Sequence, residues 1–378
     1  MTDVVYLIGS LPRAGAGRHL VQLTGALDRA RFRPRMLCLR REGELVEVFE
    51  GMGIPVAGLD VPGVRSPLFA PRIAALVPAL RRLRPQVLHT YLFPSNLFGS
   101  IAGRLARVPV VITSRRSMSD IEPVRHRQAY RWINRLADRV VAVSEASAES
   151  ACRAEGLERS RIRVIENGID AEPYHGGHDP RLKETLFGIP ASARLLGMVS
   201  NFRPLKGQDD FIAMSALLPA TDASGREIRF VIVGEGPGRA ASEAKVAAAG
   251  LAGRFHFAGL RGDIPQVLRS LDVFLYPSHS EGISNALMEG MAAGCPIVAA
   301  RCPGNETILG EGTAVLVPPS EPPALAAAAL RLLDDSAEAA RIGAAAPRRI
   351  ETGFGARRMA EAFEALYREC LAARGIAA

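Results

Sequence analysis

Two glutamates, Glu281 and Glu289, stand eight positions apart in the segment SEGISNALMEG, among small and apolar residues. Carboxylates accept hydrogen bonds from hydroxyl groups, so one could bind the hydroxyls of a sugar and the other those of a ribose. Ser284 is a suitable N-cap for a helix that begins near Asn285 and ends at Gly294. Glu281 would then lie in the loop before the helix, and Glu289, about one turn into it, would face the same site.

The same segment permits a purely structural interpretation. Ser278 and Glu281 match the S-x-x-E capping box, in which the glutamate only satisfies the start of a helix. Gly282 and the Ser284-Asn285 pair favour the later helix start instead. With that start, the backbone N–H groups near residues 283–286 would face an anion, because a helix N-terminus carries unpaired donors and a positive dipole end.

Arg203 and Lys206 lie in NFRPLKGQDDF, between a predicted strand and the next predicted helix. Cations in such a turn can hold a diphosphate without a metal ion. The alternative is an ordinary solvated charge. Lysine is scarce in this chain, with three among 47 basic residues, so a lysine at this turn is less easily explained as surface composition.

Two glycine-rich loops also follow predicted strands. In RAGAGRHL, residues 13–20, Gly15 and Gly17 would let the backbone approach a ligand, although Leu20 breaks the dinucleotide pattern GxGxxG. In VGEGPGRAA, residues 233–241, the glycines could carry a nucleotide or only turn the chain. The neighbouring segment RGDIPQVLRSLD, residues 261–272, could face a base, with the same alternative open.

Short β-branched runs alternate with helical patterns along the whole chain, which predicts two doubly wound α/β domains with parallel sheets. In the first half the strands are expected at residues 4–9, 35–39, 87–91, 108–114, 139–144 and 162–168. In the second half they are expected at residues 195–200, 229–236, 255–259, 273–278, 296–300 and 314–319. Ligands of such sheets bind beyond the carboxyl ends of the strands, so the active site is expected in a cleft between the domains.

Composition limits the classes of protein to consider. Apolar residues make up 48% and charged residues 23% of the 378, as in soluble globular proteins. The start MTDVVYLIGS fits a first strand rather than a secretory signal, and every long apolar stretch is interrupted before it could span a bilayer. Five scattered cysteines favour a reducing cytosol over a disulfide or zinc framework.

Positive charge is concentrated in the first half of the chain. Residues 1–170 hold 26 Arg and 16 Asp plus Glu, a balance of +10, whereas the rest of the chain has a balance of −2. Arg127, Arg131, Arg135 and Arg139 recur every four residues, beside Trp132, and predict one basic helix face. This face is either merely solvated or binds an anionic membrane or acidic substrate. No nucleic-acid-binding signature is present, so nucleic acid is not an expected partner.

The ordered motifs AGAGRHLVQL, VIENGID, NFRPLKG, VGEGPG, SEGISNALMEG and CPGNETILGEGTAVLV resemble the retaining glycosyltransferases of family 4. The resemblance covers nearly the whole chain, and its specific part is the Glu-x7-Glu segment combined with the upstream Arg and Lys. It implies the GT-B fold of two facing Rossmann-like domains. We expect an acceptor-binding domain at residues 1–172, a linker at 173–187, a nucleotide-sugar-binding domain at 188–355 and a C-terminal helix at 356–378 that crosses back to the first domain.

The resemblance also implies roles for individual residues. Arg203 and Lys206 would hold the diphosphate, Glu281 would contact the donor sugar near the reacting centre, and Glu289 would bond the nucleotide ribose. Further donor-binding positions would be Gly234, Gly236, Arg261, Gly282, Ile283, Ser284 and Asn285. The first glycine loop, with Gly15, Ala16, Gly17 and Arg18, would lie close to the phosphates and the acceptor.

Two departures from the family pattern concern the acceptor side. The family's first loop is often Gly-Gly-Ala-Glu-Arg, and here Ala14 and Gly17 replace its first glycine and its glutamate, whereas Arg18 matches. Many members carry a histidine near the end of the strand that here reads TSRRS, where Arg115 or Arg116 stands. His89 in VLHTY is a candidate substitute, or else a histidine packed at a strand end.

The resemblance therefore predicts a retaining, metal-independent glycosyltransferase that moves a sugar from a nucleotide-diphosphate sugar to a cell-envelope glycan or lipid-linked acceptor. No cofactor is expected, and no DxD-type cluster suggests a metal. The enzyme would be cytoplasmic, or peripheral on the inner face of the membrane. A nucleotide-sugar epimerase or hydrolase on the same fold, and a non-catalytic nucleotide-sugar-binding protein, are the alternatives.

Overall fold

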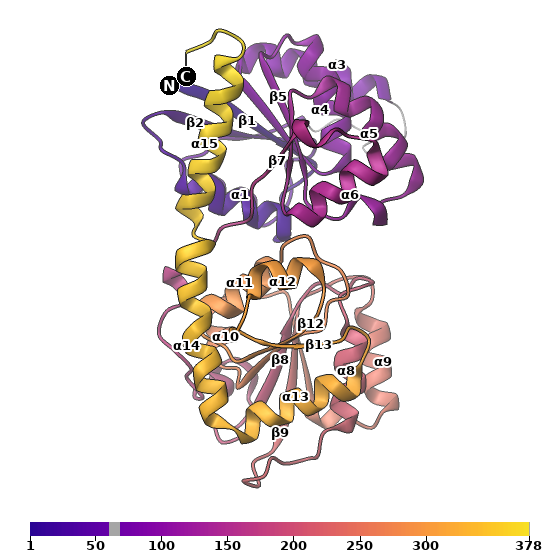
Figure 1. Cartoon of the computed structure of the whole chain (residues 1–378), viewed down its shortest axis with the longest axis vertical. Coiled ribbons are helices and arrows are strands. Elements are labelled where there is room, and N and C mark those ends of the chain that lie inside the picture. The colour runs from indigo at the N-terminus through magenta and orange to yellow at the C-terminus, as the bar shows by residue number, and fades with distance from the viewer. Residues whose placement is uncertain (60–68, 378) are drawn as a thin grey trace. The chain divides into compact units, whose positions relative to one another are not determined.

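The computed structural model describes residues 1–59 and 69–377, which divide into two compact α/β units (Figure 1). The first unit comprises residues 1–168 and 356–378, and the second comprises residues 169–355. All twelve predicted strands are present, with ends shifted by up to four residues. A thirteenth strand, β3 (Val56–Gly58), was not predicted from the sequence, because three half-exposed residues give too short a pattern.

The sheet of the first unit is parallel, with the strand order β3-β2-β1-β4-β5-β6-β7. Its other strands are β1 (Thr2–Ile8), β2 (Phe32–Cys38), β4 (Val87–Tyr91), β5 (Val110–Arg115), β6 (Arg139–Ala142) and β7 (Ile162–Val164). Its helices are α1 (Gly15–Ala26), α2 (Leu45–Gly51), α3 (Phe69–Leu83), α4 (Phe93–Leu105), α5 (Val124–Leu136), α6 (Glu145–Glu155) and α15 (Ala356–Ala372), with short 3-10 turns at Ser119–Ile121 and Arg159–Arg161.

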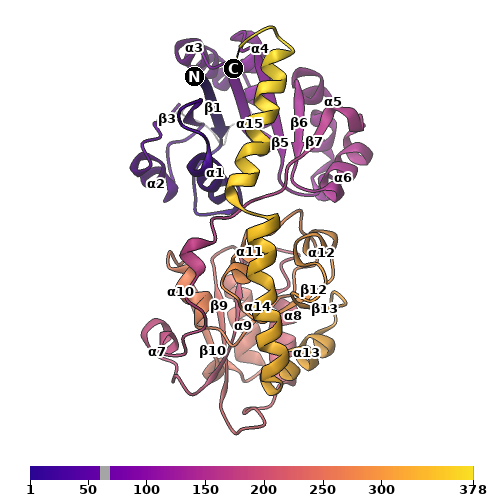
Figure 2. The same cartoon turned by 60° about the vertical axis from the view of Figure 1, so that its left-hand side comes forward.

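Side chains of β1 alternate between the two faces of this sheet. Val4, Tyr6 and Ile8 pack with α1, α2 and α15, whereas Val5 and Leu7 pack with α3 and α4. Because both faces are covered by helices, the strands are apolar throughout, as expected for a parallel sheet. Figures 1 and 2 show α15, the last helix of the chain, beside α1 on one of these faces.

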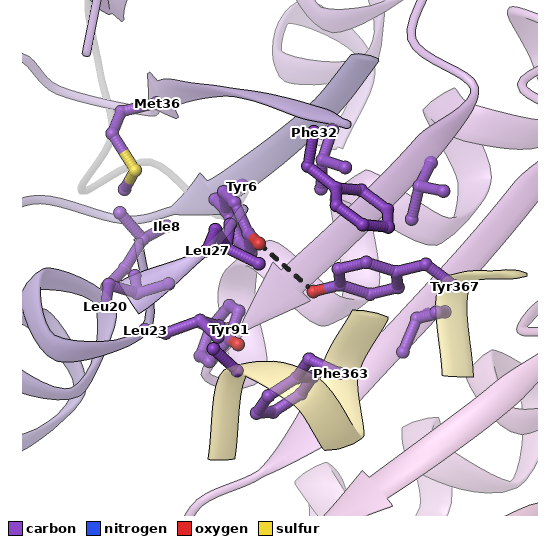
Figure 3. Packing of buried hydrophobic residues seen from close by; sticks show 14 of the residues in the cluster. Tyr6, Ile8, Leu20, Leu23, Leu27, Phe32, Met36, Tyr91, Phe363 and Tyr367 are labelled. Carbon is purple, nitrogen blue, oxygen red and sulfur yellow. Dashed lines mark hydrogen bonds between the residues drawn. The ribbon is translucent and has the colours of Figure 1, made fainter. Parts of the chain in front are cut away.

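The apolar face of α15 completes the core of the first unit. Phe363 and Tyr367 insert between α1 and the strands, as Figure 3 shows. The Tyr367 hydroxyl donates a hydrogen bond to the hydroxyl of Tyr6 on β1, with an O–O distance of 3.2 Å. A residue near the end of the chain is thereby bonded to the first strand, and the first unit requires both ends of the sequence.

The sheet of the second unit is also parallel, with the order β10-β9-β8-β11-β12-β13. Its strands are β8 (Arg194–Val199), β9 (Ile228–Val233), β10 (Phe255–Gly259), β11 (Val273–Tyr276), β12 (Ile297–Ala300) and β13 (Val315–Val317). Its helices are α7 (Leu182–Phe187), α8 (Gln208–Leu217), α9 (Arg239–Ala248), α10 (Ile264–Arg269), α11 (Asn285–Ala292), α12 (Pro303–Leu309), α13 (Pro322–Asp334) and α14 (Ser336–Gly353), with short 3-10 turns at Glu172–Tyr174 and Ala252–Arg254.

Residues 173–187, which were expected to form a linker, belong to the second unit in the structure. Their helix α7 carries Lys183, which is buried and donates to Asp272 at 2.6 Å. Asp272 also accepts from Arg194, whose Nε donates to Asp222 at 2.9 Å. This chain of buried ion pairs holds α7 and the first residue of β8 against the rest of the unit.

The Asp222 carboxylate is a sensitive part of this network. Its burial opposes ionisation, but hydrogen bonds from Arg194 and Arg226 outweigh burial and lower its pKa to about 2. A depressed carboxyl pKa stabilises the folded state above the unfolded value, near 4, and this stabilisation disappears as the pH falls through about 2.

We therefore expect Asp222→Asn to lower the melting temperature at neutral pH and to have progressively less effect between pH about 4 and 2. Melting curves of both proteins across this range would measure the difference. Glu227→Gln, which removes an exposed carboxylate of the same unit, is the matched control. A difference that stays constant down to pH 2 would contradict the proposed contribution of Asp222.

Candidate functional site

The strand order of the second unit creates a topological switch point between β8 and β11. The chain leaves β8 toward β9 on one side and returns to β11 on the other, so the loops that follow these two strands diverge there. Ligands of open parallel sheets bind beyond the carboxyl ends of the strands at such a point. The two loops contain the predicted cations, Arg203 and Lys206, and the predicted glutamate, Glu281.

Backbone contacts hold these two loops together. Gly207 lies so close to β11 that a Cβ added to it would be 2.1 Å from the carbonyl oxygen of Pro277. The carbonyl oxygen of Leu205 accepts a hydrogen bond from the His279 backbone N–H at 2.8 Å. Leu205 itself has a φ of +69°, a left-handed conformation that costs a residue with a side chain about 1 kcal/mol or more.

The Glu281 carboxylate is held by three donors at a single oxygen. Lys206 Nζ, the Tyr276 hydroxyl and the Ser278 hydroxyl each lie 2.7 Å from its Oε1 atom. The side chain of Glu281 is 8% exposed, and that of Lys206 is 28% exposed. Hydrogen bonds of this kind, one of them from a charged donor, fix the position of the carboxylate. The Ser278-Glu281 pair is thus a side-chain contact inside the site rather than a capping box.

Helix α11 begins and ends where the sequence predicted. The Ser284 hydroxyl accepts a hydrogen bond from the Leu287 backbone N–H, as an N-cap does, and donates one to the Tyr276 hydroxyl at 2.6 Å. Gly290 lets the helix lie directly on the sheet, because a Cβ there would be 2.4 Å from the Phe274 ring. Glu289, one residue earlier, is 3% exposed, so its carboxylate is buried.

The first turn of α12 packs against the backbone of the loop that carries Glu281. A Cβ on Gly304 would lie 2.5 Å from the carbonyl oxygen of Glu281 and 2.7 Å from that of Gly282. Asn305, the next residue, is fully buried and donates to the carbonyl oxygen of Ala300 at the end of β12. The segment CPGN thus connects the end of β12 to the backbone that carries Glu281.

The other residues predicted to bind the donor lie in the loops after β8, β9, β10 and β11. Arg203 is exposed and, within the described part of the chain, its guanidinium has no ion-pair partner. Gly234 and Gly236 have positive φ and pack against the carbonyl oxygens of Ser200 and Phe202, so they hold the β9 loop against the β8 loop. Arg261 is bonded to Asp263 through Nε and Nη2, and Ile283 is buried.

In the first unit, the structure corrects the assignment of Arg115 as an acceptor contact. Arg115 is 3% exposed and forms a buried ion pair with Glu155, with Nε at 2.9 Å from the carboxylate. It also donates to Thr113 and Asn134, and its guanidinium lies over the Tyr130 ring. Because all these groups surround the guanidinium, its contacts are those of a residue that stabilises the packing of β5 against α6.

His89 is likewise a packed histidine, which was the alternative interpretation. It is fully buried on β4, with Nδ1 at 2.8 Å from the Tyr367 hydroxyl and Nε2 at 2.8 Å from the Ser114 hydroxyl. Since Tyr367 donates to Tyr6, the network assigns the proton of His89 to Nδ1. Burial and the Arg116 cation hold its pKa well below the ordinary value, so it is neutral, and both of its ring nitrogens are bonded within the unit.

Arg116, one residue after the end of β5, is placed differently from Arg115. It lies at the carboxyl edge of the sheet, where its Nη2 donates to Asn167 in the loop after β7. The first glycine loop reaches the same edge: α1 starts at Gly15, and Arg18 is half-buried. Gly17 is required for packing, because a Cβ there would be 2.7 Å from Leu45. Ala16 packs at the border of the core.

Sequence reasoning missed three contributors to these sites. Tyr276 looked like a core strand residue, but its hydroxyl reaches Glu281. Gly304 had no signal beyond the Pro-Gly pair in CPGN. His19, buried on α1, lies 3.4 Å from the Tyr91 hydroxyl and has its pKa lowered by burial and then by Arg116. Only its place in AGAGRHL, next to Arg18, pointed to it.

A cavity of about 480 Å³ elsewhere in the first unit does not compete with these sites. It is lined by Arg139, Arg159 and Arg163 together with Glu145 and Glu369, near the amino ends of β6 and β7. Each of these arginines lies within 4 Å of one of the two glutamates, so the three positive charges are largely offset. Residues 1–59 and 69–377 contain no group of three or more His, Cys, Asp or Glu side chains placed to hold a metal ion.

Family models match both units of the chain. Residues 13–173 match the model described as Glycosyltransferase Family 4, and residues 193–335 match the one described as Glycosyl transferases group 1. The chain belongs to the family 4, group 1 glycosyltransferases. The resemblance inferred from the motifs is thereby confirmed. Both residues of the Lys206-Glu281 pair lie within the range matched by the group 1 model.

Curated relatives of the transferase are named glycosyltransferases. It is 33% identical over 257 residues to the 2-deoxystreptamine glucosyltransferase of Streptomyces kanamyceticus, covering 64% of this chain and 65% of that protein. It is 28% identical over 341 residues to the 2-deoxystreptamine N-acetyl-D-glucosaminyltransferase of Streptomyces fradiae, covering 83% and 80%. It is 30% identical over 253 residues to the D-inositol 3-phosphate glycosyltransferase of Kineococcus radiotolerans, covering 62% and 58%. The chain therefore spans less than two thirds of the first and third of these relatives.

Solved structures confirm the fold. The transferase superposes on Anabaena HepE in complex with UDP and glucose with a TM-score of 0.86 at 23% identity, covering 97% of this chain and 99% of that one. It superposes on sucrose-phosphate synthase from Thermosynechococcus elongatus with a TM-score of 0.80 at 20% identity, covering 99% and 100%. The fold is GT-B, with two Rossmann-like units, as predicted.

The close approach of Gly304 to the Glu281 loop generates a prediction about stability. Gly304→Ala should lower the melting temperature by several degrees, because a clash of this kind costs roughly 1–3 kcal/mol. Gly253→Ala is the matched control, since a Cβ there meets nothing within 4 Å. If the two variants melt at the same temperature, this contradicts the close packing of Gly304 against the Glu281 loop.

Proposed function

We propose that the transferase moves a sugar, with retention and without a metal ion, from a nucleotide-diphosphate sugar to a glycan or lipid-linked acceptor of the cell envelope. The observation that carries the proposal is the Lys206-Glu281 ion pair at the switch point of the second unit. It places a cation and an ionised carboxylate side by side where such sheets bind ligands. The donor would bind there, with Glu289 at the ribose.

The distribution of charge suits the departure of a diphosphate. Negative charge grows on the phosphate oxygens as the bond to the sugar breaks, while the anomeric carbon becomes oxocarbenium-like. Exposed Arg203, Lys206 and the N–H groups at the start of α11 would stabilise the phosphates. Glu281 would orient the hydroxyls of the sugar. A bound diphosphate would attract Lys206 away from Glu281. The carboxylate of Glu281 would then still accept hydrogen bonds from Tyr276 and Ser278.

The bonding of Glu281 disfavours its use as a nucleophile. Its Oε1 atom accepts hydrogen bonds from Lys206, Tyr276 and Ser278, and the two hydroxyl groups would stay when the diphosphate attracts Lys206. Hydrogen bonds to a carboxylate oxygen lower its nucleophilicity. Retention would instead come from attack of the acceptor on the face that the diphosphate leaves, with a phosphate oxygen taking the acceptor proton. No covalent sugar-enzyme intermediate is part of this proposal.

The acceptor would bind at the strand ends of the first unit. The names of the relatives include transfer to 2-deoxystreptamine, to D-inositol 3-phosphate and, for an Escherichia coli protein of 25% identity, to a GlcNAc-diphosphoundecaprenol. Relatives of this chain are thus named for basic, acidic and lipid-linked acceptors. We favour the envelope glycan or lipid-linked class because the first half of the chain is strongly basic.

Helix α5 offers a surface for an anionic membrane. Val124, Arg131, Trp132 and Arg135 share one face by their helical spacing, and all four are exposed. Trp132 is 69% exposed, with the Arg135 guanidinium 4.8 Å from its ring. Exposed apolar and aromatic groups between arginines are typical of helices that lie in a lipid interface. Arg139, predicted on the same face, belongs to β6 instead, because α5 ends at Leu136.

No helix among residues 1–59 and 69–377 is both long and apolar enough to cross a bilayer. We therefore propose contact through the α5 face rather than through a spanning segment. Electrostatic attraction would supply about 1 kcal/mol for each arginine near an anionic surface. Trp132 and Val124 would add apolar burial at the interface.

The nucleotide site is tested by thermal shift in the presence of EDTA. One nucleoside diphosphate among UDP, GDP, ADP, CDP and dTDP should raise the melting temperature, because a ligand of the folded state stabilises it. Arg203→Ala combined with Lys206→Ala should abolish the rise. Lys245→Ala, which removes an exposed lysine of the same unit, should retain it. A rise that requires a divalent metal would contradict metal independence.

Catalysis is tested separately with Glu281→Gln, which keeps the size of the side chain but removes its charge. We expect transfer to fall by at least about 100-fold, as for loss of a charged transition-state contact, while the nucleotide shift remains. Transfer would be assayed with the sugar nucleotide whose base gives the thermal shift. Donor breakdown without acceptor would identify the hydrolase alternative, and binding without turnover would identify the sensor.

Membrane binding is tested by sedimentation with vesicles that contain anionic phospholipid. Arg131→Gln, Arg135→Gln and Trp132→Ser together should reduce binding by roughly tenfold or more, because each lost arginine removes about 1 kcal/mol. Arg82→Gln with Arg107→Gln removes two exposed arginines of the same unit outside α5 and is the control. Equal loss in both variants would show only a general effect of net charge.

A further inference from the structure

Arg116 is half-buried, and no carboxylate compensates its positive charge. Its Nη2 donates to Asn167, but its Nε and Nη1 atoms are buried and have no hydrogen-bond partner. These two nitrogens carry three N–H donors. Within residues 1–59 and 69–377, no acidic side chain lies within ion-pair distance of the guanidinium. A buried charge without a counter-ion is costly, so its presence requires an explanation.

The neighbouring residue shows how this unit compensates a buried arginine that has only a structural role. Arg115 is opposed by Glu155, and this carboxylate, together with the Tyr130 ring, outweighs burial and raises its pKa. Nothing comparable opposes Arg116, and burial lowers its pKa to about 10. Arg116 is still charged near neutral pH. The two adjacent arginines therefore differ in burial and, more importantly for their charge, in that a carboxylate pairs with Arg115 but not with Arg116.

The groups around Arg116 supply no negative charge at neutral pH, so the charge of the guanidinium favours an anion over a second cation. Its titratable neighbours are Tyr91 at the end of β4, His89 on the same strand and His19 on α1. Burial and Arg116 hold the pKa of both histidines well below the ordinary value, so both are neutral. Asn167 approaches from the loop after β7. Three chain segments, β4, α1 and the loop after β7, thus converge on the guanidinium at the carboxyl edge of the sheet.

We propose that the Nε and Nη1 groups of Arg116 bind an oxyanion, a phosphate or carboxylate group carried by the acceptor. The inference rests on the proposed function, because it takes the first unit as the acceptor site. The oxyanion would supply the counter-charge that Glu155 supplies to Arg115. An acceptor with an amine at this position would be repelled by the guanidinium, so Arg116 would select acidic acceptors over basic ones.

The proposal is tested on the full chain, without nucleotide, by thermal shift with millimolar inorganic phosphate or acetate against sodium chloride of the same ionic strength. Phosphate, acetate or both should raise the melting temperature of the natural protein by roughly 3 °C at saturation. Comparing the two anions distinguishes a phosphate site from a carboxylate site. The general stabilising effect of phosphate salts is removed by comparison with Arg116→Met, which should lose the anion-specific rise.

The same variant separates a binding role from a structural one. Without added anion, Arg116→Met should melt at the natural temperature or higher, since it replaces an uncompensated, half-buried charge by an apolar side chain of similar length. Arg115→Met should melt lower by roughly 10 °C, because it leaves Glu155 buried and unpaired. Arg116→Lys, which keeps the charge but loses the fork of donors, should retain a reduced response to the anion.

The inference would be overturned by an anion response that is absent from the natural protein, or by one that Arg116→Met retains. A large drop in the melting temperature of Arg116→Met without anion would also contradict it, because the guanidinium would then be structural. These results leave the transferase proposal intact if the nucleotide shift that depends on Arg203 and Lys206 is present. Loss of the nucleotide shift with an intact anion response would contradict the donor site alone.

Discussion

The ion pair between Lys206 and Glu281 joins the two loops on which the candidate donor site depends. One loop follows β8 and the other follows β11, and 75 residues separate the two side chains in the sequence. The pair can form only because the strand order brings β8 and β11 together at the centre of the sheet. Gly207 and Gly304 then allow backbone to touch backbone on either side, which a side chain would prevent. The chemistry of the site is therefore a consequence of close packing beneath it.

The two units differ in whether their buried or partly buried cations are paired with carboxylates. In the second unit, Lys183, Arg194 and Lys206 each lie against a carboxylate, and the network of the first two anchors the structure far from the switch point. In the first unit, Arg115 follows the same rule, whereas Arg116 does not. A compensated charge needs no ligand and suits a scaffold. An uncompensated charge lowers the stability of the free protein and returns that free energy when an anion binds.

Much of the fold could be predicted from the sequence, because buried parallel strands leave continuous β-branched runs between helical patterns. The donor-side loops were also predictable, since Ser284 caps α11 and Lys206 is one of few lysines. The acceptor side was not. Arg115 and Arg116 are identical in sequence terms, and only the position of Glu155, 40 residues away, decides that one is structural. His89 was ambiguous for the same reason, because its partner Tyr367 lies 278 residues later.

The dependence of the first unit on α15 links the carboxyl edge of its sheet to the last helix of the chain. Tyr367 accepts from His89, and His89 accepts from Ser114, two residues before Arg116 on the same strand and edge. Each of these bonds is buried among aromatic rings and formed by neutral groups, so the network is insensitive to pH near neutrality. It supports Arg116 without sharing its charge. Because charge is confined to the guanidinium, an anion bound there would meet one strong donor group backed by a neutral, rigid core.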